Sequence, residues 1–319
     1  MQDKLVSIIT PCYNTGHILH RLFDSILLQD YPAIEVIAVN DGSSDNTEEV
    51  INNYKNKFEE KGYLLRYIFQ ENQGQSAAIN CALKFVNGTY LCWPDSDDFY
   101  KSSNAISTFI HTFDNLDDSY GVVRCIPTFV DENTLCEIRT LVITEEFLKP
   151  DQFDNCINSR NFIWIPGNYM LKMSVFDKVV KNREIFHEKN AGQNFQILLP
   201  ILYFYKCKTL TDSLFCVLER ALSHSRGQYQ TFEKQHEKFH AYDNTVVSTL
   251  NAIQQMPEDE REHYIQNLKK QKIIRDFVLA IQFHKRDVAI VCYRQICQAK
   301  LKVSFRLIIK YWLLFFFNC

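Results

Sequence analysis

The stretch LVSIITPCYNTG (residues 5–16) carries the first signal that decides the fold. Its apolar beginning is typical of a buried strand, which Pro11 and the turn at Asn14–Gly16 close. Apolar residues then recur at helical spacing from Ile18 to Leu27. The chain therefore opens with a strand, a turn and a helix.

The same order of elements repeats along the first half of the chain. Further apolar, strand-like runs occupy residues 36–39, 64–69 and 90–93, and a helical pattern covers 76–85. A fifth candidate strand covers residues 121–130. Strands that are apolar throughout and are separated by helices indicate an α/β fold, with a mostly parallel sheet sandwiched by helices.

Polar clusters follow three of these expected strands. They lie at Thr10 to Asn14, at Asp41 and at Asp95 to Asp98. In open α/β sheets, ligands bind beyond the carboxyl ends of the strands. Because three separate strand ends carry polar residues, we expect the clusters to form one site.

The group Asp95-Ser96-Asp97-Asp98 brings three carboxylates close together. Holding three negative charges this close together is unfavourable in free energy unless a cation or hydrogen-bond donors compensate them. Oxygen ligands suit Mg²⁺ or Mn²⁺, and Mg²⁺ commonly joins one or two carboxylates to substrate phosphates. An EF-hand calcium loop is excluded, because Tyr100 stands where that loop requires glycine. The alternative is a solvated acidic turn, which the position after a buried strand disfavours.

Asp41 ends the second expected strand, in the segment Val39-Asn40-Asp41-Gly42. A carboxylate at this point can accept hydrogen bonds from a nucleobase N–H or a ribose hydroxyl. The alternative is that Asp41 only shapes the turn while Asp45 caps the helix that follows.

Charge is distributed unevenly along the chain. The formal net charge is −3, which argues against a nucleic-acid-binding protein. Residues 268–319 nevertheless contain eleven Lys or Arg and two acids, a net of about +9, so the preceding residues carry about −12. The apolar and aromatic segment 303–317 includes Arg306 and Lys310, a pattern typical of a helix at an anionic membrane surface. The alternative is a terminal helix packed on the body or on another subunit.

Cysteine usage and the N-terminus bear on the compartment. The eleven cysteines are scattered and form no C-x-x-C pair, which favours a reducing cytoplasm. The N-terminus runs straight into a strand, so we expect no signal peptide. No apolar stretch reaches the roughly 18 residues of a membrane span. These features predict a cytoplasmic protein, held peripherally on the inner face of the cell membrane by its tail.

Several segments together resemble the start of the inverting family 2 glycosyltransferases. In order, they are residues 6–14, 25–29, 35–44, 72–80 and 95–98. The resemblance is strongest over residues 4–115, weaker to about 230, and absent beyond. It implies the GT-A fold. The expected glycosyltransferase domain covers residues 1–230, with a donor half at about 1–115 and an acceptor half at about 116–230, and a helical, basic C-terminal extension covers 231–319.

The resemblance also implies roles for residues of the donor half. A nucleotide-diphosphate sugar, expected to be a UDP-sugar, would bind with a divalent cation, Mn²⁺ or Mg²⁺. The expected donor-binding residues are Thr10, Pro11, Tyr13, Asn14, Asp41, Gly74, Gln75 and Asp95. Asp97 would be the main cation ligand, with Asp95 beside it, and a cation at a leaving diphosphate acts as a Lewis acid. Ile79 stands where many relatives carry Arg, so one phosphate contact is expected to be missing or replaced.

The acceptor half departs from the family pattern at the general base. Relatives carry a Glu-Asp pair whose Asp deprotonates the acceptor, whereas the matching position here reads Gln193-Asn194. An amide cannot act as a base at useful pH. Three hypotheses remain: that Glu188 or His187 supplies the base, that Asp98 supplies it, or that the amides only orient the acceptor. Glu188 is the first candidate, and the alternative for it is an exposed charge beside Lys189.

Two further features are candidate parts of the site. His224 stands where some GT-A enzymes bring a late loop over the diphosphate, so it could complete the metal shell while Arg226 pairs with phosphate. Trp164, and also Tyr169, could stack on an acceptor sugar, and Gln193 could contact it. For each of these residues, ordinary surface exposure or packing is the alternative.

The resemblance, together with the acidic cluster, therefore implies an inverting, metal-dependent glycosyltransferase. As the resemblance further implies, it would transfer a sugar to a glycan or lipid-linked acceptor in the synthesis of a surface polysaccharide or glycolipid. The alternative is a non-catalytic relative that binds sugar nucleotides but has lost its base. A nucleotidyltransferase or a dehydrogenase is disfavoured, because neither a basic phosphate loop nor G-x-G-x-x-G follows the first strand.

Overall fold

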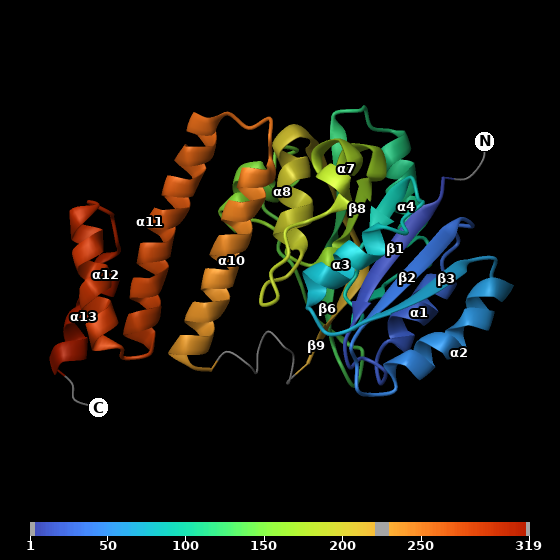
Figure 1. Cartoon of the computed structure of the whole chain (residues 1–319), viewed down its shortest axis with the longest axis horizontal. Coiled ribbons are helices and arrows are strands. Elements are labelled where there is room, and N and C mark those ends of the chain that lie inside the picture. The colour runs from blue at the N-terminus through green and yellow to red at the C-terminus, as the bar shows by residue number, and fades with distance from the viewer. Residues whose placement is uncertain (1–3, 221–229, 317–319) are drawn as a thin grey trace. The chain divides into compact units, whose positions relative to one another are not determined.

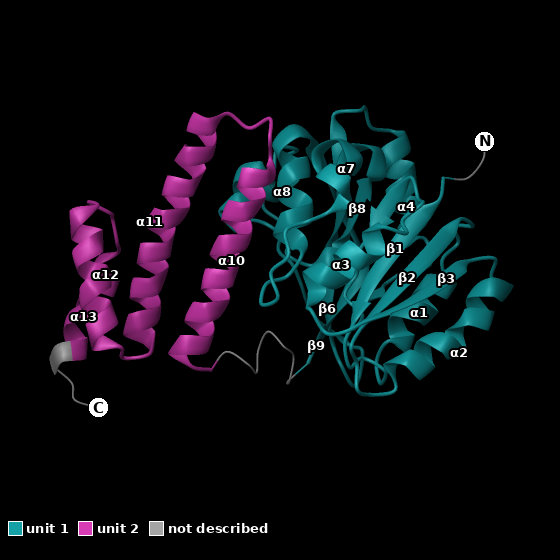
Figure 2. Ribbon diagram, viewed as in Figure 1, with its two compact units in different colours: residues 1–220 teal, residues 221–319 magenta. Residues whose placement is uncertain are grey.

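The computed structural model describes residues 4–220 and 230–316, and the chain divides into two compact units, residues 1–220 and 221–319 (Figures 1 and 2). The strands, all in unit 1, are β1 (Val6–Cys12), β2 (Ile34–Asp41), β3 (Leu64–Gln70), β4 (Tyr90–Cys92), β5 (Phe99–Tyr100), β6 (Tyr120–Asp131), β7 (Glu137–Thr140), β8 (Tyr169–Lys172) and β9 (Lys206–Glu219). Its α-helices are α1 (His20–Leu27), α2 (Thr47–Glu60), α3 (Gln75–Leu83), α4 (Ala105–Asp114), α5 (Glu145–Leu148), α6 (Phe153–Ile157), α7 (Met173–Val179) and α8 (Asn194–Phe204), with short 3-10 helices at Pro166–Asn168 and Lys181–Arg183.

The strands of unit 1 form one sheet in the order β3-β2-β1-β4-β8-β6-β9-β5, with β7 paired to β6. The first four strands in this order are parallel, in agreement with their apolar sequences. The second half is mixed, because β8 runs antiparallel to both β4 and β6 while β9 runs parallel to β6. The α/β fold predicted from the sequence is confirmed.

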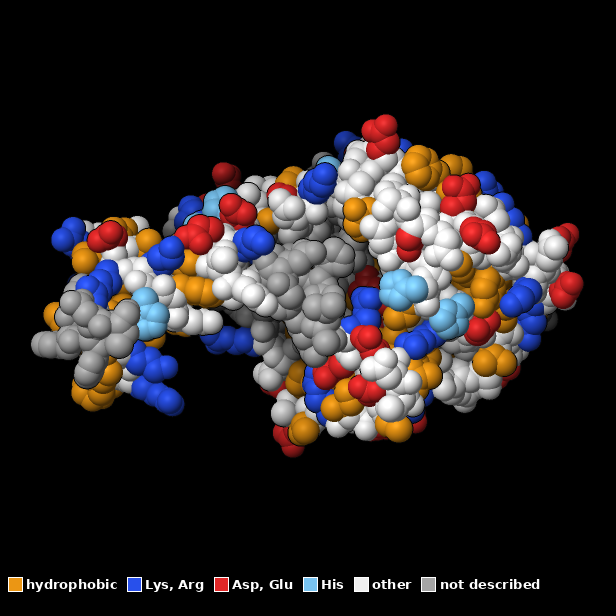
Figure 3. Space-filling view, turned by 90° about the horizontal axis from the view of Figure 1, so that it is seen from below, with side chains coloured by type: hydrophobic (Ala, Val, Ile, Leu, Met, Phe, Trp, Pro, Cys, Tyr) orange, Lys and Arg blue, Asp and Glu red, His pale blue; other side chains and the backbone are white. Residues whose placement is uncertain are grey.

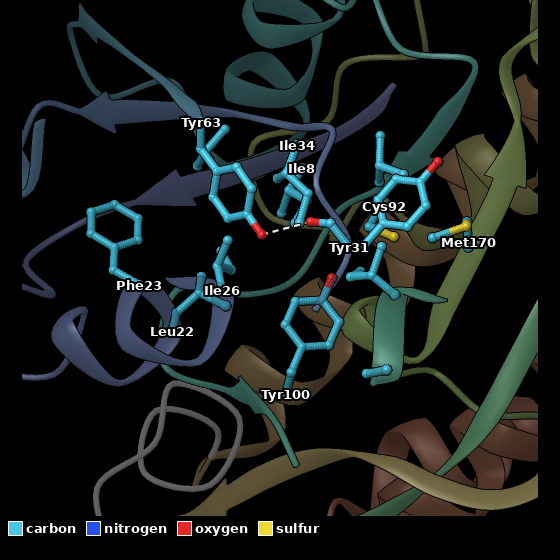
Figure 4. Packing of buried hydrophobic residues seen from close by; sticks show 14 of the residues in the cluster. Ile8, Leu22, Phe23, Ile26, Tyr31, Ile34, Tyr63, Cys92, Tyr100 and Met170 are labelled. Atoms are coloured by element: carbon cyan, nitrogen blue, oxygen red, sulfur yellow. Dashed lines mark hydrogen bonds between the residues drawn. The ribbon is translucent and has the colours of Figure 1, made fainter. Parts of the chain in front are cut away.

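Helices cover both faces of the parallel half of the sheet. Alternate residues of β1 and β2 pack against α1, α2 and α4, and Ile8, Ile34 and Ile26 of this cluster are labelled in Figure 4. The Phe23 ring contacts the rings of Tyr54 and Phe58. The Tyr63 hydroxyl donates to the carbonyl of Tyr31 within this cluster, at 2.6 Å. Successive side chains of a strand point to opposite faces of the sheet. Helix α3 packs on β1 and β2 on the face opposite to α1, α2 and α4.

Ile79 belongs to the buried side of α3 and is fully enclosed. It therefore contributes to the core, and it offers no phosphate contact in place of the arginine that many relatives carry.

Side-chain hydrogen bonds join the loops that follow β1 and β2. The Asn14 backbone N–H donates to Ser43 Oγ at 2.9 Å, and the Ser44 N–H donates to Asn14 Oδ1 at 2.8 Å. The Gly16 N–H donates to Asp45 Oδ2 at 3.0 Å. These bonds hold the polar ends of two neighbouring strands together at one edge of the sheet.

Unit 2 is helical. It contains α10 (Phe232–Ala252), α11 (Glu258–Gln282), α12 (Arg286–Gln298) and α13 (Phe305–Phe316). Phe277 of α11, Cys292 of α12 and Tyr311 of α13 belong to its buried core. Across residues 4–220 and 230–316, no helix combines the length and the hydropathy that a membrane crossing needs.

Candidate active site

Asp97 and Arg220 form an ion pair at the carboxyl end of the sheet. Asp97 follows β4, Arg220 directly follows β9, and an oxygen of Asp97 contacts Nη2 of Arg220. Both side chains remain partly exposed, at 26% and 19%. The pair therefore places a carboxylate and a guanidinium, from two strands distant in sequence, at a surface that a ligand can reach.

Asp95 lies beside this pair and accepts hydrogen bonds from two amide side chains. Gln75 Nε2, at the start of α3, is 3.3 Å from Asp95 Oδ1, and Gln193 Nε2, just before α8, is 3.5 Å from it. Desolvation by the surrounding protein and the negative charge of Asp97 raise the pKa of Asp95 to about 7, against the lowering effect of Gln193. A cation at this place would relieve that cost.

Asp98 does not point to the same place as Asp95 and Asp97. Its Oδ1 accepts a hydrogen bond from the Leu218 backbone N–H at 3.0 Å, and the residue is only 6% exposed. Burial, followed by the charges of Asp97 and Asp95, raises the pKa of Asp98 well above its usual value. This placement disfavours the hypothesis that Asp98 is the base, because its carboxyl group is used to join the β4–β5 turn to β9.

Asp41 is buried and organises the loop after β3. Its carboxylate accepts hydrogen bonds from Gln70 Nε2 at 2.7 Å, the Gln73 N–H at 2.9 Å and the Gly74 N–H at 2.8 Å. The residue is 3% exposed. Gly74 has a φ of +91°, a conformation that favours glycine. In this conformation of the chain, the Asp41 carboxylate accepts hydrogen bonds from the backbone of the loop that leads into α3.

The other nucleoside-pocket candidates differ in exposure. Thr10 and Pro11 are buried, and the Thr10 hydroxyl has no hydrogen-bond partner among the described residues. Tyr13 is 41% exposed, and Asn14, with a φ of 53°, is partly exposed. Of this group, Tyr13 offers the most accessible surface to a ligand.

The loop of residues 185–189 lies along α3. Asn80 of α3 exchanges hydrogen bonds with both backbone groups of Ile185, at 2.9 Å each. Ser76 does the same with Glu188, at 3.1 Å each. A side chain at Gly74 would meet the Lys189 carbonyl at 2.8 Å. Residues 185–189 are thus held closely against the start of α3.

Glu188 and His187 lie on this loop. Glu188 is partly exposed, and its Oε1 accepts from the Asn190 backbone N–H at 3.3 Å. His187 is exposed, and its Nε2 is 2.9 Å from the Gln73 carbonyl. Both residues therefore lie next to the loop that carries Gly74 and Gln75.

Gln193 and Asn194 are held by the protein itself. Gln193 is 1% exposed and reaches Asp95, as described above. Asn194 accepts a hydrogen bond from Trp93 Nε1 at 3.1 Å and donates one to the Trp164 carbonyl at 2.9 Å. Both ends of the Asn194 amide are therefore bound within the chain.

Trp164 belongs to a group of aromatic side chains. Its ring centroid lies 4.1 Å from that of Phe195 and 4.7 Å from that of Phe162, and the residue is partly exposed. Tyr169 is fully buried, and its hydroxyl donates to the Ile163 carbonyl. Tyr169 therefore packs in the core and cannot stack on a sugar, whereas Trp164 keeps some accessible surface.

The remaining metal candidate, His224, and its neighbour Arg226 lie outside the described residues. Within the described part of the chain, no group of three or more His, Cys, Asp or Glu side chains is arranged to hold a metal ion. A cation held by Asp95 and Asp97 would therefore need further ligands from outside the described residues.

Arg220 is the residue that the sequence interpretation missed. It stands two residues after the apolar run Phe215-Cys216-Val217-Leu218, so its position just beyond a strand end was a usable signal. Residues 140–230 showed no clear alternation with helices, and the strand before Arg220 was therefore not recognised.

A mixed α/β sheet covered by helices, with acidic residues beyond the carboxyl end of β4, is the arrangement of the GT-A class of fold, which the solved structures below share. Residues 7–180 match the family model described as Glycosyl transferase family 2. The chain belongs to this family.

Two proteins that are similar to this chain in sequence are also described as glycosyltransferases. An uncharacterized glycosyltransferase of Rickettsia prowazekii is 37% identical over 132 residues, which cover 41% of this chain and 39% of that protein. The glycosyltransferase GlyG of Streptococcus pneumoniae is 30% identical over 241 residues, covering 71% of this chain and 75% of GlyG. The chain thus spans about two fifths of the first relative's length and three quarters of GlyG.

Solved structures share the fold at low sequence identity. S. aureus TarS in complex with UDP-GlcNAc superposes with a TM-score of 0.59 at 16% identity, covering 89% of this chain and 82% of that one. The mannosyltransferase PcManGT of Pyrobaculum calidifontis, in complex with GDP-Man and Mn²⁺, gives a TM-score of 0.56 at 15% identity, covering 97% and 79%.

Proposed function

We propose that this chain transfers a sugar from a nucleotide-diphosphate donor, a UDP-sugar, to a glycan or lipid-linked acceptor with inversion, in the assembly of a surface polysaccharide or glycolipid. The observation that carries the proposal is the meeting of Asp95, Asp97 and Arg220 at the carboxyl end of the sheet in a family 2 chain. The structural neighbour TarS, solved with UDP-GlcNAc, supports a UDP-sugar.

Asp95 and Asp97 fit a divalent cation only together with the donor. Two carboxylates are too few for a closed protein site, but Mg²⁺ and Mn²⁺ commonly take their other ligands from substrate phosphates and water. The raised pKa of Asp95 indicates that its carboxylate lacks compensating charge. The bound cation would supply Lewis-acid stabilisation of the leaving diphosphate. PcManGT, solved with GDP-Man and Mn²⁺, supports a cation of this kind.

Arg220 would bind the diphosphate. Its guanidinium is a planar donor group suited to phosphate oxygens, and its present partner is the carboxylate of Asp97. A donor that brings its own negative charge would compete for Arg220 and leave Asp97 free for the cation. The same ion pair would therefore keep both side chains in place before the donor arrives.

The transfer itself needs an acceptor hydroxyl and a place for its proton. The hydroxyl oxygen would form a bond to the anomeric carbon on the face opposite the diphosphate, and the bond from that carbon to the diphosphate oxygen would break. Glu188 is the first candidate to accept the hydroxyl proton, because its side chain is partly exposed on the loop beside Gly74 and Gln75. Trp164, which keeps accessible surface, would lie on the acceptor side, whereas Gln193 is 1% exposed and bonded to Asp95, so the predicted contact between Gln193 and the acceptor is disfavoured.

A second candidate function is non-catalytic binding of a sugar nucleotide. The observation that favours it is the amide pair Gln193 and Asn194, whose side chains are engaged by Asp95, Trp93 and Trp164. Such a protein would keep the donor site and lack the base.

The C-terminal helix supports peripheral binding to the inner face of an anionic membrane. Tyr311 and Leu314 of α13 pack inward, whereas its opposite side exposes apolar residues. These residues are Phe305, Ile309, Trp312 and Leu313. The exposed Lys302, Arg306 and Lys310 lie beside them in sequence. Figure 3 shows hydrophobic and basic side chains exposed together on one face of the protein. We propose that residues 1–230 form the glycosyltransferase domain and that this helix belongs to a separate extension, residues 231–319.

Donor hydrolysis tests the proposed function. UDP- and GDP-sugars are screened with Mn²⁺ for slow release of the sugar by the wild type, Asp97→Ala, Arg220→Ala and Glu188→Gln. We expect one donor to be turned over, with losses of roughly 100-fold or more in Asp97→Ala and Arg220→Ala. Tight donor binding without turnover, on any donor or acceptor extract, would establish the non-catalytic alternative.

A further inference from the structure

The amide of Asn194 joins two tryptophans from different parts of the chain. Its Oδ1 accepts from Trp93 Nε1 at 3.1 Å, and its Nδ2 donates to the Trp164 carbonyl at 2.9 Å. One neighbour is a donor and the other an acceptor, so the side chain between them must offer both functions. An amide does so at any pH, whereas an ionised carboxylate only accepts.

The two partners of Asn194 differ in their surroundings. Trp93 is fully buried, comes directly after β4 and stands two positions before Asp95. Trp164 is partly exposed and packs against Phe162 and Phe195, and Phe195 is the residue next to Asn194. Asn194 thus links the buried end of the donor strand to an aromatic group with accessible surface.

We infer that Asn194 is a positioning residue, whose amide fixes Trp164 beside the end of β4 as a platform for the ring of an acceptor sugar, and that it is not the remnant of a base. A ring that packs against two aromatic neighbours, and whose backbone is held by a hydrogen bond, presents its remaining accessible surface at low entropic cost. We call the two hydrogen bonds from Asn194 to Trp93 and Trp164 the clamp. The binding of an acceptor sugar rests on the proposed function, whereas the clamp does not.

The clamp is tested with Asn194→Asp, which preserves the shape of the side chain. At low pH the protonated carboxyl group of this variant donates to the Trp164 carbonyl and accepts from Trp93, as the amide does. At higher pH the carboxylate oxygen faces a carbonyl oxygen, so the pKa of the introduced group is raised in the folded state and its stabilising effect is lost as the pH rises. We expect a Tm near that of the wild type at pH 5 and roughly 4 °C lower at pH 8.

The matched control for this measurement is Asn115→Asp. Asn115 Nδ2 also donates to a carbonyl, that of His111 at 2.8 Å, but in an exposed place where water replaces the bond. The Tm of Asn115→Asp should differ from that of the wild type by about 1 °C or less at either pH. If the Tm of Asn194→Asp falls between pH 5 and pH 8 by no more than the Tm of Asn115→Asp, the clamp is refuted.

A second measurement does not require Asn194→Asp to fold well. The chain has three tryptophans, so a Trp312→Phe background leaves Trp93, which is buried, and Trp164. Acrylamide quenching in this background then reports mainly on Trp164. Asn194→Ala should raise the quenching constant about twofold as the ring loosens, and Asn115→Ala should not. An unchanged quenching constant in Asn194→Ala would contradict the positioning role.

Turnover separates this inference from the proposed function. With a UDP-sugar and water as acceptor, Asn194→Asp at pH 8 should hydrolyse the donor no faster than the wild type. A gain of tenfold or more would show that position 194 is a vacant base and would overturn the inference. If neither protein turns over any donor while the Tm and quenching results hold, the clamp stands and the proposed function fails.

Discussion

The adjacent carboxylates after β4 have different roles although they stand next to each other in sequence. Asp97 faces Arg220, Asp95 faces the amides of Gln75 and Gln193, and Asp98 binds the backbone of β9. The sequence indicated that the cluster lies at a ligand-binding edge. It could not assign the three carboxylates, because each assignment depends on a partner from a distant segment.

Asp95 provides a pH-dependent test at the level of one residue. Its folded-state pKa of about 7 exceeds the ordinary value of about 4, so the folded protein holds a proton that the unfolded chain releases between these values. The free energy of unfolding therefore falls as pH rises through this range. In EDTA, Asp95→Asn should match the wild type near pH 4 and exceed its Tm by several degrees at pH 8.

The control for this prediction is Asp118→Asn, since the Asp118 side chain is fully exposed. Thermal unfolding at four pH values between 4 and 8 gives the comparison. A Tm difference that does not change with pH, or that equals the difference for Asp118→Asn, would contradict the environment described for Asp95.

At the scale of secondary-structure elements, α3 is one of the places where residues 1–115 contact residues 116–220. Ser76 and Asn80 lie one turn apart on α3 and bind the backbone of Glu188 and Ile185. The segment 72–80 resembled the family in sequence, but that resemblance did not indicate what these two polar side chains contact.

Removing these side chains should loosen the loop. Asn80→Ala takes away the partner of the Ile185 N–H, and Ser76→Ala that of the Glu188 N–H. We expect amide exchange in a peptide covering 183–190 to become roughly tenfold faster in each variant. Hydrogen–deuterium exchange with mass spectrometry measures this, with Asn115→Ala as a control on an exposed amide. Unchanged exchange would show that the loop is held by other contacts.

The elements of the first half could be predicted because each has a continuous apolar run with clear ends. The runs 36–39, 64–69 and 90–93 correspond to β2, β3 and β4. β8 and β9 could not be predicted from the sequence. β8 has only four residues, and the middle of β9 is polar and partly exposed, so neither strand forms a continuous apolar run. Arg220 was missed with β9, so half of the central ion pair was absent from the sequence interpretation.

For the whole molecule, the uneven charge gives a testable expectation about surfaces. The basic residues accumulate after residue 268, and α13 exposes apolar side chains beside some of them. Replacing Lys302, Arg306 and Lys310 together by Gln should weaken binding to phosphatidylserine-containing vesicles by roughly 100-fold. Trp312→Glu should weaken it as well, and the binding should fall with added salt.

The control for vesicle binding is Leu28→Glu, which places the same charge on an exposed leucine of unit 1. Vesicle sedimentation compares the variants on anionic and neutral lipid, and deletion of residues 303–319 should abolish pelleting. Equal binding to neutral vesicles, or an equal loss in Leu28→Glu, would contradict attachment through α13.

Equilibrium binding of a UDP-sugar in the presence of Mn²⁺ tests the central claim, a donor site at Asp95, Asp97 and Arg220, most directly. Calorimetric titration of the wild type, Asp97→Ala and the exposed control Asp118→Ala should show binding of one UDP-sugar, a loss of at least about tenfold in Asp97→Ala, and no change in the control. If the wild type binds no nucleotide sugar with Mn²⁺, or if Asp97→Ala binds it as tightly as the wild type, the account of this site is wrong.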